Sequence, residues 1–217
     1  MPKSIEFQYK GFLNTPTLWE QGIVLSEQWS MKQCALLGAG SVSEVRFENR
    51  KRLRLGQLVE QFVFHELKQM KLSEVLASNV QIKNGKITVG ELDAVIENKK
   101  TTEKIHLEIV YKFYLYDDSI EGYELDKWIG PNRKDDLVQK LSKLKKKQLP
   151  LLYKEETREA LNKIGIDADE LKQQVLFKAQ LFVSSQQMNN DFALVNNNCI
   201  AGYYIRYSEL EGFNQNE

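Results

Sequence analysis

The sequence predicts an α/β protein in which one mixed sheet is flanked by helices. Three observations predict this class. Apolar residues recur at three- and four-residue steps over residues 55–70, three strand-like runs follow, and a second helical stretch precedes further strands. This order lacks the regular βαβ alternation of a dinucleotide-binding fold. We expect residues 50–207 to form the domain, residues 1–49 to be an N-terminal extension packed on its core, and residues 208–217 to be an acidic tail.

The first predicted helix and the three strands after it have the clearest signals. The helix places an apolar stripe on one face, formed by Leu55, Leu58, Val59, Phe62, Val63 and Leu67. Two strand-like runs, 79–83 and 86–96, flank Asn84-Gly85, and this dipeptide between such runs is a strong hairpin signal. Residues 104–115 are rich in β-branched and aromatic residues and predict a third strand.

The second half of the predicted domain begins with an acidic loop over residues 117–127. A helix is expected from Arg133 to Gln148, with Leu137, Leu141 and Leu144 buried, ending before Pro150. Shorter helices are predicted over residues 154–164 and 167–173. Strands are predicted over residues 175–183 and 199–207, which completes the sheet.

Composition excludes several classes of protein. The 217 residues carry 30 Lys+Arg and 30 Asp+Glu, so any nucleic-acid contact must rest on local patches rather than on net charge. Two distant cysteines exclude a disulfide framework and favour a reducing, cytoplasmic location. We expect no membrane span and no secretory signal. His65 and His106 are expected at the surface or sheet margin, which does not favour a zinc site.

Acidic residues inside the predicted strands point to chemistry, because strands disfavour them. Glu91 and Asp93 share one face of the second strand, and Glu108 and Lys112 share one face of the third. Glu60 lies beside the apolar stripe of the first helix. Carboxylate oxygens suit Mg²⁺ or Mn²⁺, and such an ion bound with a nearby lysine is typical of phosphodiester hydrolysis.

These motifs carry a resemblance to known families. Gly-x-x-x-Glu at residues 56–60, Gly-Glu-Leu-Asp at 90–93 and a strand with an acid and a lysine resemble the PD-(D/E)XK, or restriction-endonuclease-like, nuclease superfamily. Three segments, residues 106–115, 128–131 and 136–141, also resemble a bacterial family named domain of unknown function 1853. The resemblance implies an αβββαβ core and Mg²⁺-dependent cleavage of DNA or, second, RNA.

The resemblance also assigns roles to residues. It makes Asp93 and Glu108 the metal ligands, Lys112 the lysine that positions the attacking water, and Glu60 a support for the metal. One departure matters, because the superfamily places its acid two residues before the lysine, where this chain has Val110. Four residues of regular strand span about 13 Å rather than about 7 Å, so a β-bulge near residues 109–111 would be needed to bring Glu108 and Lys112 together.

A nucleic-acid partner requires positive surface, and the second helix offers it. Seven basic residues against two acidic ones over residues 133–147 form a predicted binding strip, led by Arg133, Lys134, Lys140, Lys143 and Lys147. A second basic cluster spans residues 50–54. Because Val110 occupies the usual acid position, a nuclease-like domain that has lost catalysis and binds nucleic acid or protein stays an alternative. Self-association, as a homodimer, through the aromatic N-terminal extension is a third hypothesis.

Overall fold

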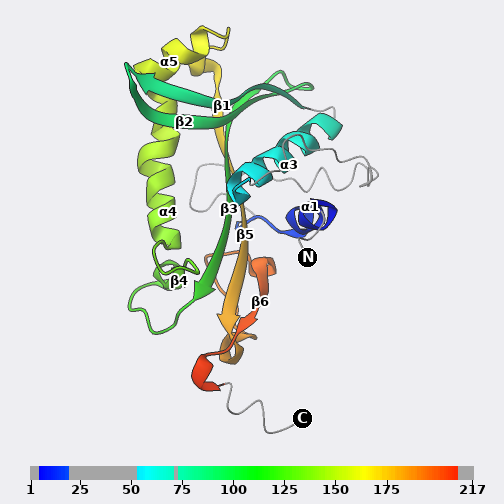
Figure 1. The fold of residues 1–217 in the computed structure, drawn as a ribbon, viewed down its shortest axis with the longest axis vertical. Coiled ribbons are helices and arrows are strands. Elements are labelled where there is room, and N and C mark those ends of the chain that lie inside the picture. Colours follow the sequence, from blue (N-terminus) through cyan, green and yellow to red (C-terminus); the bar gives the residue numbers. More distant parts are fainter. Residues whose placement is uncertain (1–4, 20–52, 71–72, 210–217) are drawn as a thin grey trace.

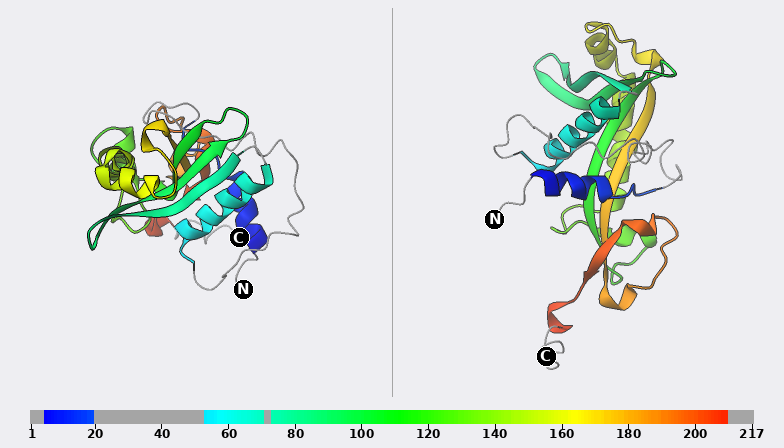
Figure 2. Two further views of the ribbon diagram at one scale, coloured as in Figure 1. Left: turned by 90° about the horizontal axis from the view of Figure 1, so that it is seen from above. Right: turned by 90° about the vertical axis from the view of Figure 1, so that its right-hand side faces the viewer.

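The computed structural model describes residues 5–19, 53–70 and 73–209. In these residues a six-stranded mixed sheet stands between helices (Figures 1 and 2). β1 and β2 form an antiparallel hairpin, β2 runs antiparallel to β3, and β3, β5 and β6 are parallel. The strands are β1 (Ser73–Asn84), β2 (Ile87–Asn98), β3 (Lys104–Tyr116), β4 (Trp128–Ile129), β5 (Lys172–Ser184) and β6 (Ile200–Tyr204). The predicted α/β class with helices flanking a mixed sheet is confirmed.

The helices cover the two faces of the long β3–β5 pair. α1 (Ile5–Asn14) and α3 (Leu55–Met70) lie on one side, and α4 (Leu137–Lys143) lies on the other (Figure 2). α5 (Glu155–Asn162) stands at the end of the sheet where the β1–β2 hairpin crosses over (Figure 1). Among the described residues, no helix is both long enough and apolar enough to cross a membrane.

Period-two alternation along β3 divides the core between these two layers. Ile105 and Leu107 pack in one cluster with Phe62 of α3. Val110 and Tyr114, which have the opposite parity, pack in a second cluster with Leu141 of α4. The polar residues His106, Glu108 and Lys112 have the parity of Val110, so β3 directs them toward the α4 side.

The second predicted helix differs from the structure at both ends. It begins at Leu137 rather than Arg133, because the Asp136 side chain caps it by accepting from the Gln139 N–H at 2.7 Å. Arg133 lies before the cap with a positive φ of 53°. The helix also continues past Pro150, since a π turn (Leu144–Gln148) leads into a 3₁₀ turn (Leu149–Tyr153) whose opening tolerates proline.

Strand boundaries also differ from the sequence prediction. β1 begins at Ser73 rather than residue 79, because it pairs with β2 along nearly its whole length, from the Ser73–Asn98 pair onward. β4 lies at the end of the predicted acidic loop, where it pairs with the end of β3. The stretch 167–173 forms only a 3₁₀ turn (Ala168–Glu170), and its latter part begins β5.

α1 of the N-terminal extension packs on the chain's own core. Tyr9 and Phe12 are buried in the cluster that contains Phe62. The Lys178 ammonium of β5 is buried beneath the end of α1 and donates to the carbonyls of Phe12, at 3.0 Å, and of Thr15. Residues 20–49 of the extension, residues 50–52 of the predicted basic cluster, and tail residues 210–217 lie outside the described residues.

Candidate active site

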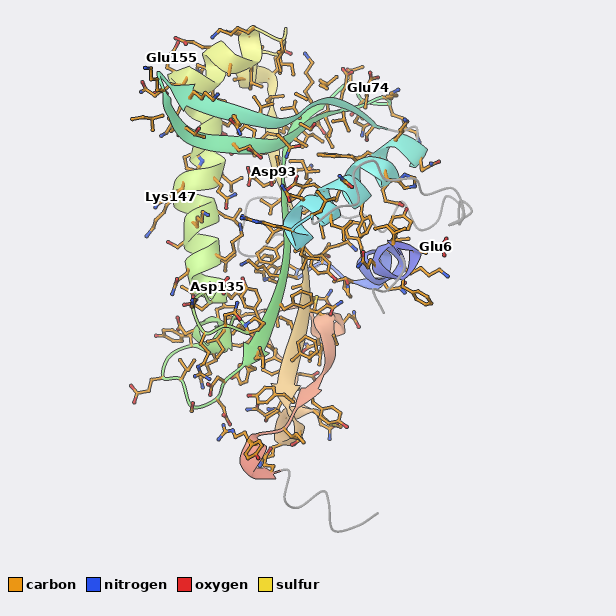
Figure 3. The ribbon with its side chains drawn as sticks, viewed as in Figure 1. Glu6, Glu74, Asp93, Asp135, Lys147 and Glu155 are labelled. Atoms are coloured by element: carbon orange, nitrogen blue, oxygen red, sulfur yellow. The ribbon has the colours of Figure 1, made fainter. Side chains whose placement is uncertain are left out.

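The candidate site lies where β2 and β3 part. Their ladder ends at the pair Ala94–Leu107, and the hairpin then turns away from β3. Asp93 is the residue of β2 next to Ala94, just beyond the end of this ladder. Its carboxylate accepts a hydrogen bond of 2.8 Å from the backbone N–H of Ile109. Figure 3 shows Asp93 beneath the hairpin, between α4 and α3. The Asp93 side chain thus accepts a hydrogen bond from β3 at the point where the two strands separate.

Glu108 is fully buried on β3, and both of its carboxylate oxygens accept hydrogen bonds. The Gln148 amide, from the π turn, donates to Oε2 at 2.6 Å. His106 Nε2 lies 3.2 Å from Oε1, two residues back on the same strand face. A buried carboxylate without partners would be costly, so these two donors explain how Glu108 is accommodated in the interior.

His106 is held in one tautomer by its neighbours. Gln173 Nε2 donates to the Leu149 carbonyl at 2.7 Å, which fixes the orientation of that amide. The same Nε2 lies 3.1 Å from His106 Nδ1, so Nδ1 is the acceptor and Nε2 carries the proton toward Glu108. The expectation that His106 lies at the sheet margin is wrong, because it is fully buried between β2 and β5.

Lys140 enters this network from α4. Its ammonium donates to Gln148 Oε1 at 2.8 Å, although the two residues are eight positions apart in the helix. A lysine ammonium only donates, so this bond orients the Gln148 amide with its nitrogen toward Glu108. The chain of contacts therefore runs from Lys140 through Gln148 to Glu108 and on to His106.

The charges of the site act on one another strongly. Burial, followed by the nearby Glu108 charge, raises the pKa of Asp93 to about 7, while the Ile109 hydrogen bond acts in the opposite direction. Burial lowers the pKa of Lys140 to about 8, although the Glu108 and Asp93 carboxylates favour its charged form. Two groups of opposite charge with shifted pKa values, Asp93 from β2 and Lys140 from α4, lie around the buried Glu108, and such perturbed groups are typical of functional sites.

Glu60 of α3 borders the site through Asn79 of β1. The Asn79 amide nitrogen lies 2.9 Å from Glu60 Oε2 and 3.3 Å from Glu91 Oε1, and so joins the two carboxylates. Burial raises the pKa of Glu60, as does the Glu91 charge, and the Asn79 hydrogen bond lowers it. The Glu60 charge in turn contributes to the raised pKa of Asp93, which places both in one electrostatic environment.

Lys112 does not join Glu108 as the sequence hypothesis required. β3 pairs with β5 in unbroken register from Ile105–Lys172 to Leu115–Phe182, so β3 has no bulge near residues 109–111 that would bring Glu108 and Lys112 together. The Lys112 ammonium instead lies 2.5 Å from Asp135, just before α4. Lys112 and Glu108 remain on the same strand face but are four residues apart.

The predicted basic strip divides into two parts. Lys134, Lys143 and Lys147 are exposed, and Figure 3 shows Lys147 pointing away from the sheet on the outer side of the helix. Arg133 is also exposed and pairs with Asp117 at 2.9 Å. Lys140 is half-buried and turns inward to the site, so it does not belong to the same surface.

Comparison with known protein families gives one match. The family described as Domain of unknown function (DUF1853) matches residues 35–217, which is most of the chain. The chain belongs to the DUF1853 family. Searches of the curated proteins and of the solved structures found no match for this DUF1853 chain. The family assignment predicted from the third-strand and Trp-Ile-Gly-Pro segments is therefore confirmed.

Several functional candidates of the DUF1853 chain were not predicted from sequence. His106 could have been found, because it shares the strand face of Glu108 two positions away. Gln148 and Gln173 carry no such signal, since a lone glutamine has no typical spacing. Lys140 was assigned to a surface strip, and only the helix packing reveals that its ammonium points inward.

The donor set of this DUF1853 chain suits a hard divalent cation. Among residues 5–19, 53–70 and 73–209, no three His, Cys, Asp or Glu side chains gather closely enough to enclose a metal. Mg²⁺ needs only one or two protein carboxylates, because waters and substrate oxygens complete its shell. Asp93 and Glu108 are the two carboxylates that could hold such an ion. Each oxygen of Glu108 accepts one hydrogen bond, which leaves a second acceptor position on each.

Proposed function

We propose that this DUF1853 chain is a nuclease that depends on Mg²⁺ or Mn²⁺ and hydrolyses phosphodiester bonds in DNA, with RNA as the second substrate. The observation that carries the proposal is the gathering of Asp93 and Glu108 where β2 and β3 part, with the Lys140 ammonium joined to Glu108 through Gln148. Two adjacent carboxylates repel one another, and a divalent cation would relieve that repulsion.

The order of elements supports placing the domain in the PD-(D/E)XK superfamily. α3, β1, β2, β3, α4 and β5 occur in the αβββαβ order of that core, with the two-residue β4 inserted before α4 and α5 inserted before β5. The three-strand meander is antiparallel, and β5 returns parallel to β3 with α4 in the connection. Asp93 lies on the second strand of this meander, β2, and Glu108 lies on the third, β3. The proposal extends to the fold family as well as to the reaction.

In the proposed reaction, Asp93 and Glu108 would hold the ion, and Glu60 would support the site from α3. When bound, the ion supplies Lewis acidity and a bound water of lowered pKa. The water oxygen forms a bond to phosphorus while one ester P–O bond breaks. The leaving oxygen takes up a proton, and the proton of the attacking water passes to solvent. A reducing cytoplasm, which suits Cys34 and Cys199, is the proposed location.

Cleavage assays with the full chain test this function. We expect a plasmid to be nicked or linearised in Mn²⁺ and Mg²⁺ but not in EDTA. Asp93→Ala should slow cleavage at least about hundredfold, because one of two metal carboxylates is lost. Asp191→Asn, at an exposed carboxylate away from the site, is the matched control. Absence of cleavage of DNA and RNA, or full activity in Asp93→Ala, would contradict the proposal.

A second function is favoured by a different observation. Both Glu108 oxygens already accept hydrogen bonds, and Lys112 is paired with Asp135, so the network is satisfied without any ligand. A domain of this kind could bind nucleic acid through its exposed lysines and lack catalysis.

Salt-dependent binding measures this second function directly. Fluorescence anisotropy in EDTA should show affinity for duplex DNA that falls steeply between about 50 and 200 mM salt. The double variant Lys143→Glu/Lys147→Glu should weaken binding and flatten that dependence, since two phosphate contacts are replaced by like charges. Binding that is unaffected by the double substitution would exclude the exposed surface around Lys143 and Lys147 as the nucleic-acid interface.

A further inference from the structure

Two lysines of the DUF1853 chain lie near the paired carboxylates, and their surroundings differ. Lys112 comes from the strand position that the nuclease motif predicts, but its ammonium is 2.5 Å from Asp135 and directed toward the start of α4. Lys140 comes from α4, and its charge interacts with both Glu108 and Asp93. The structure thus pairs the lysine of the motif with Asp135 and brings a different lysine toward the carboxylates.

The π turn that follows α4 explains how Lys140 of α4 and Gln148 at the end of that turn reach the same side. Eight residues of regular α-helix turn through about 800°, which leaves two such side chains about 80° apart around the axis. The π turn over Leu144–Gln148 places more residues in one turn and so reduces this difference. Such turns within helices occur frequently at functional sites. Here the turn directs Gln148 to Glu108 and keeps it within 2.8 Å of Lys140.

The anchoring of this network extends into the centre of the sheet. Glu108 is held by His106, and His106 is held by Gln173 of β5. Gln173 is fixed in turn by the Leu149 carbonyl, directly after the π turn. β3, β5 and the α4 segment are therefore connected around one carboxylate, which limits the positions that the Lys140 ammonium can adopt.

We propose that Lys140, positioned by Gln148 on the π turn, is the lysine that contacts the phosphate of the substrate, and that Lys112 serves instead as a structural partner of Asp135. This inference rests on the proposed nuclease function. In it the Lys140 ammonium donates to a non-bridging phosphate oxygen, while Gln148 is a positioning residue that keeps the ammonium beside Glu108. The lowered pKa of Lys140 accords with this location but is not required by it.

Two measurements on the full chain test the assignment, and only one depends on cleavage. The variants are Lys140→Met and Lys112→Met, with Lys163→Met at an exposed site on the end of α5 as the matched control. Calorimetry with Mn²⁺ alone should show about three- to tenfold tighter binding by Lys140→Met, because a like charge near the ion is removed. Lys112→Met should change Mn²⁺ affinity less than about twofold, since Asp135 already offsets that charge.

The cleavage measurement should also distinguish the two lysines, because Lys140→Met is expected to bind Mn²⁺ more tightly yet cleave more slowly. Single-turnover cleavage should slow about hundredfold in Lys140→Met, while Lys112→Met should stay within about threefold of the wild type. Lys140→Arg should recover part of the rate, because the charge is restored. Circular dichroism identifies any variant that fails to fold, and Lys140→Gln then replaces Lys140→Met.

The outcomes distinguish this inference from the function on which it rests. Loss of cleavage in Lys112→Met with retention in Lys140→Met would overturn the inference and leave the nuclease function standing. A wild type that binds Mn²⁺ but cleaves no nucleic acid would overturn the function and with it the role of Lys140. Equal Mn²⁺ affinity in the two lysine variants would also contradict the assignment.

Discussion

Asp93→Asn is expected to stabilise the metal-free protein above neutral pH. The folded state raises the pKa of Asp93 from 3.8 to about 7, so between these values the folded protein holds a proton that the unfolded chain releases. Stability from this group is therefore present at low pH and is lost as the pH rises through 7. The neutral amide avoids this loss, which amounts to about 2–4 kcal/mol. Its carbonyl oxygen can still accept the Ile109 hydrogen bond.

Thermal unfolding in EDTA at pH 5.5 and pH 8.5 measures this effect. The melting temperature of Asp93→Asn should exceed that of the wild type by a larger margin at pH 8.5. Asp191→Asn, at an exposed carboxylate, should shift neither value appreciably. An equal margin at the two pH values, or a destabilised Asp93→Asn protein, would contradict the raised pKa of Asp93 in the folded protein. The same variant should lose Mn²⁺ binding, which would link the stability cost to the proposed function.

Lys178→Met is expected to cause the largest loss of stability outside the site. The buried ammonium donates to carbonyls at the end of α1, and the Phe12 ring lies 4.9 Å from it. Removing it takes this buried donor from the Thr15 carbonyl and leaves the Phe12 carbonyl with only the Thr15 N–H, at 3.2 Å, which costs about 3 kcal/mol. The Glu66 carboxylate, which is also buried, loses the favourable charge of Lys178 as well.

Circular dichroism during heating measures the effect, with a control from the same strand. A loss of about 3 kcal/mol corresponds to a fall of about 6–12 °C in melting temperature for a chain of this size. Lys172→Met removes a surface ion pair with Glu103 and should cost less than about 1 kcal/mol. Similar melting temperatures for the two variants would show that α1 docks without the Lys178 contacts.

The helix α3 and the β1–β2 hairpin were predictable because their signals are local. Apolar residues at helical spacing gave α3 its bounds, and Asn84-Gly85 identified the turn between β1 and β2. The early start of β1 was not predictable, because Ser73 and its neighbours become a strand only through pairing with β2. The helix beyond Pro150 was missed for a related reason, since the π and 3₁₀ turns change the helical period where the sequence predicts an end.

The candidate site was predictable in part. Strand parity placed Glu108, Lys112 and His106 on one face, and the Gly-Glu-Leu-Asp motif singled out Asp93. Parity alone cannot say which element covers that face or where a long side chain ends. Lys112 was therefore predicted to position the attacking water, but its ammonium pairs with Asp135, and Lys140 was assigned to a solvent-facing strip that it does not join.

The sequence by itself determined the α/β class, the order of the main elements and the family, and it singled out Asp93 and Glu108 as candidate acids, because each of these signals lies in residues close together in the chain. Only the tertiary structure decided that Asp93 meets Ile109 where two strands part and that Gln148 joins Lys140 to Glu108. Those contacts depend on the divergence of β2 from β3 and on one π turn in the helix that covers them. Both arise from packing between distant segments, and no local pattern of residues specifies them.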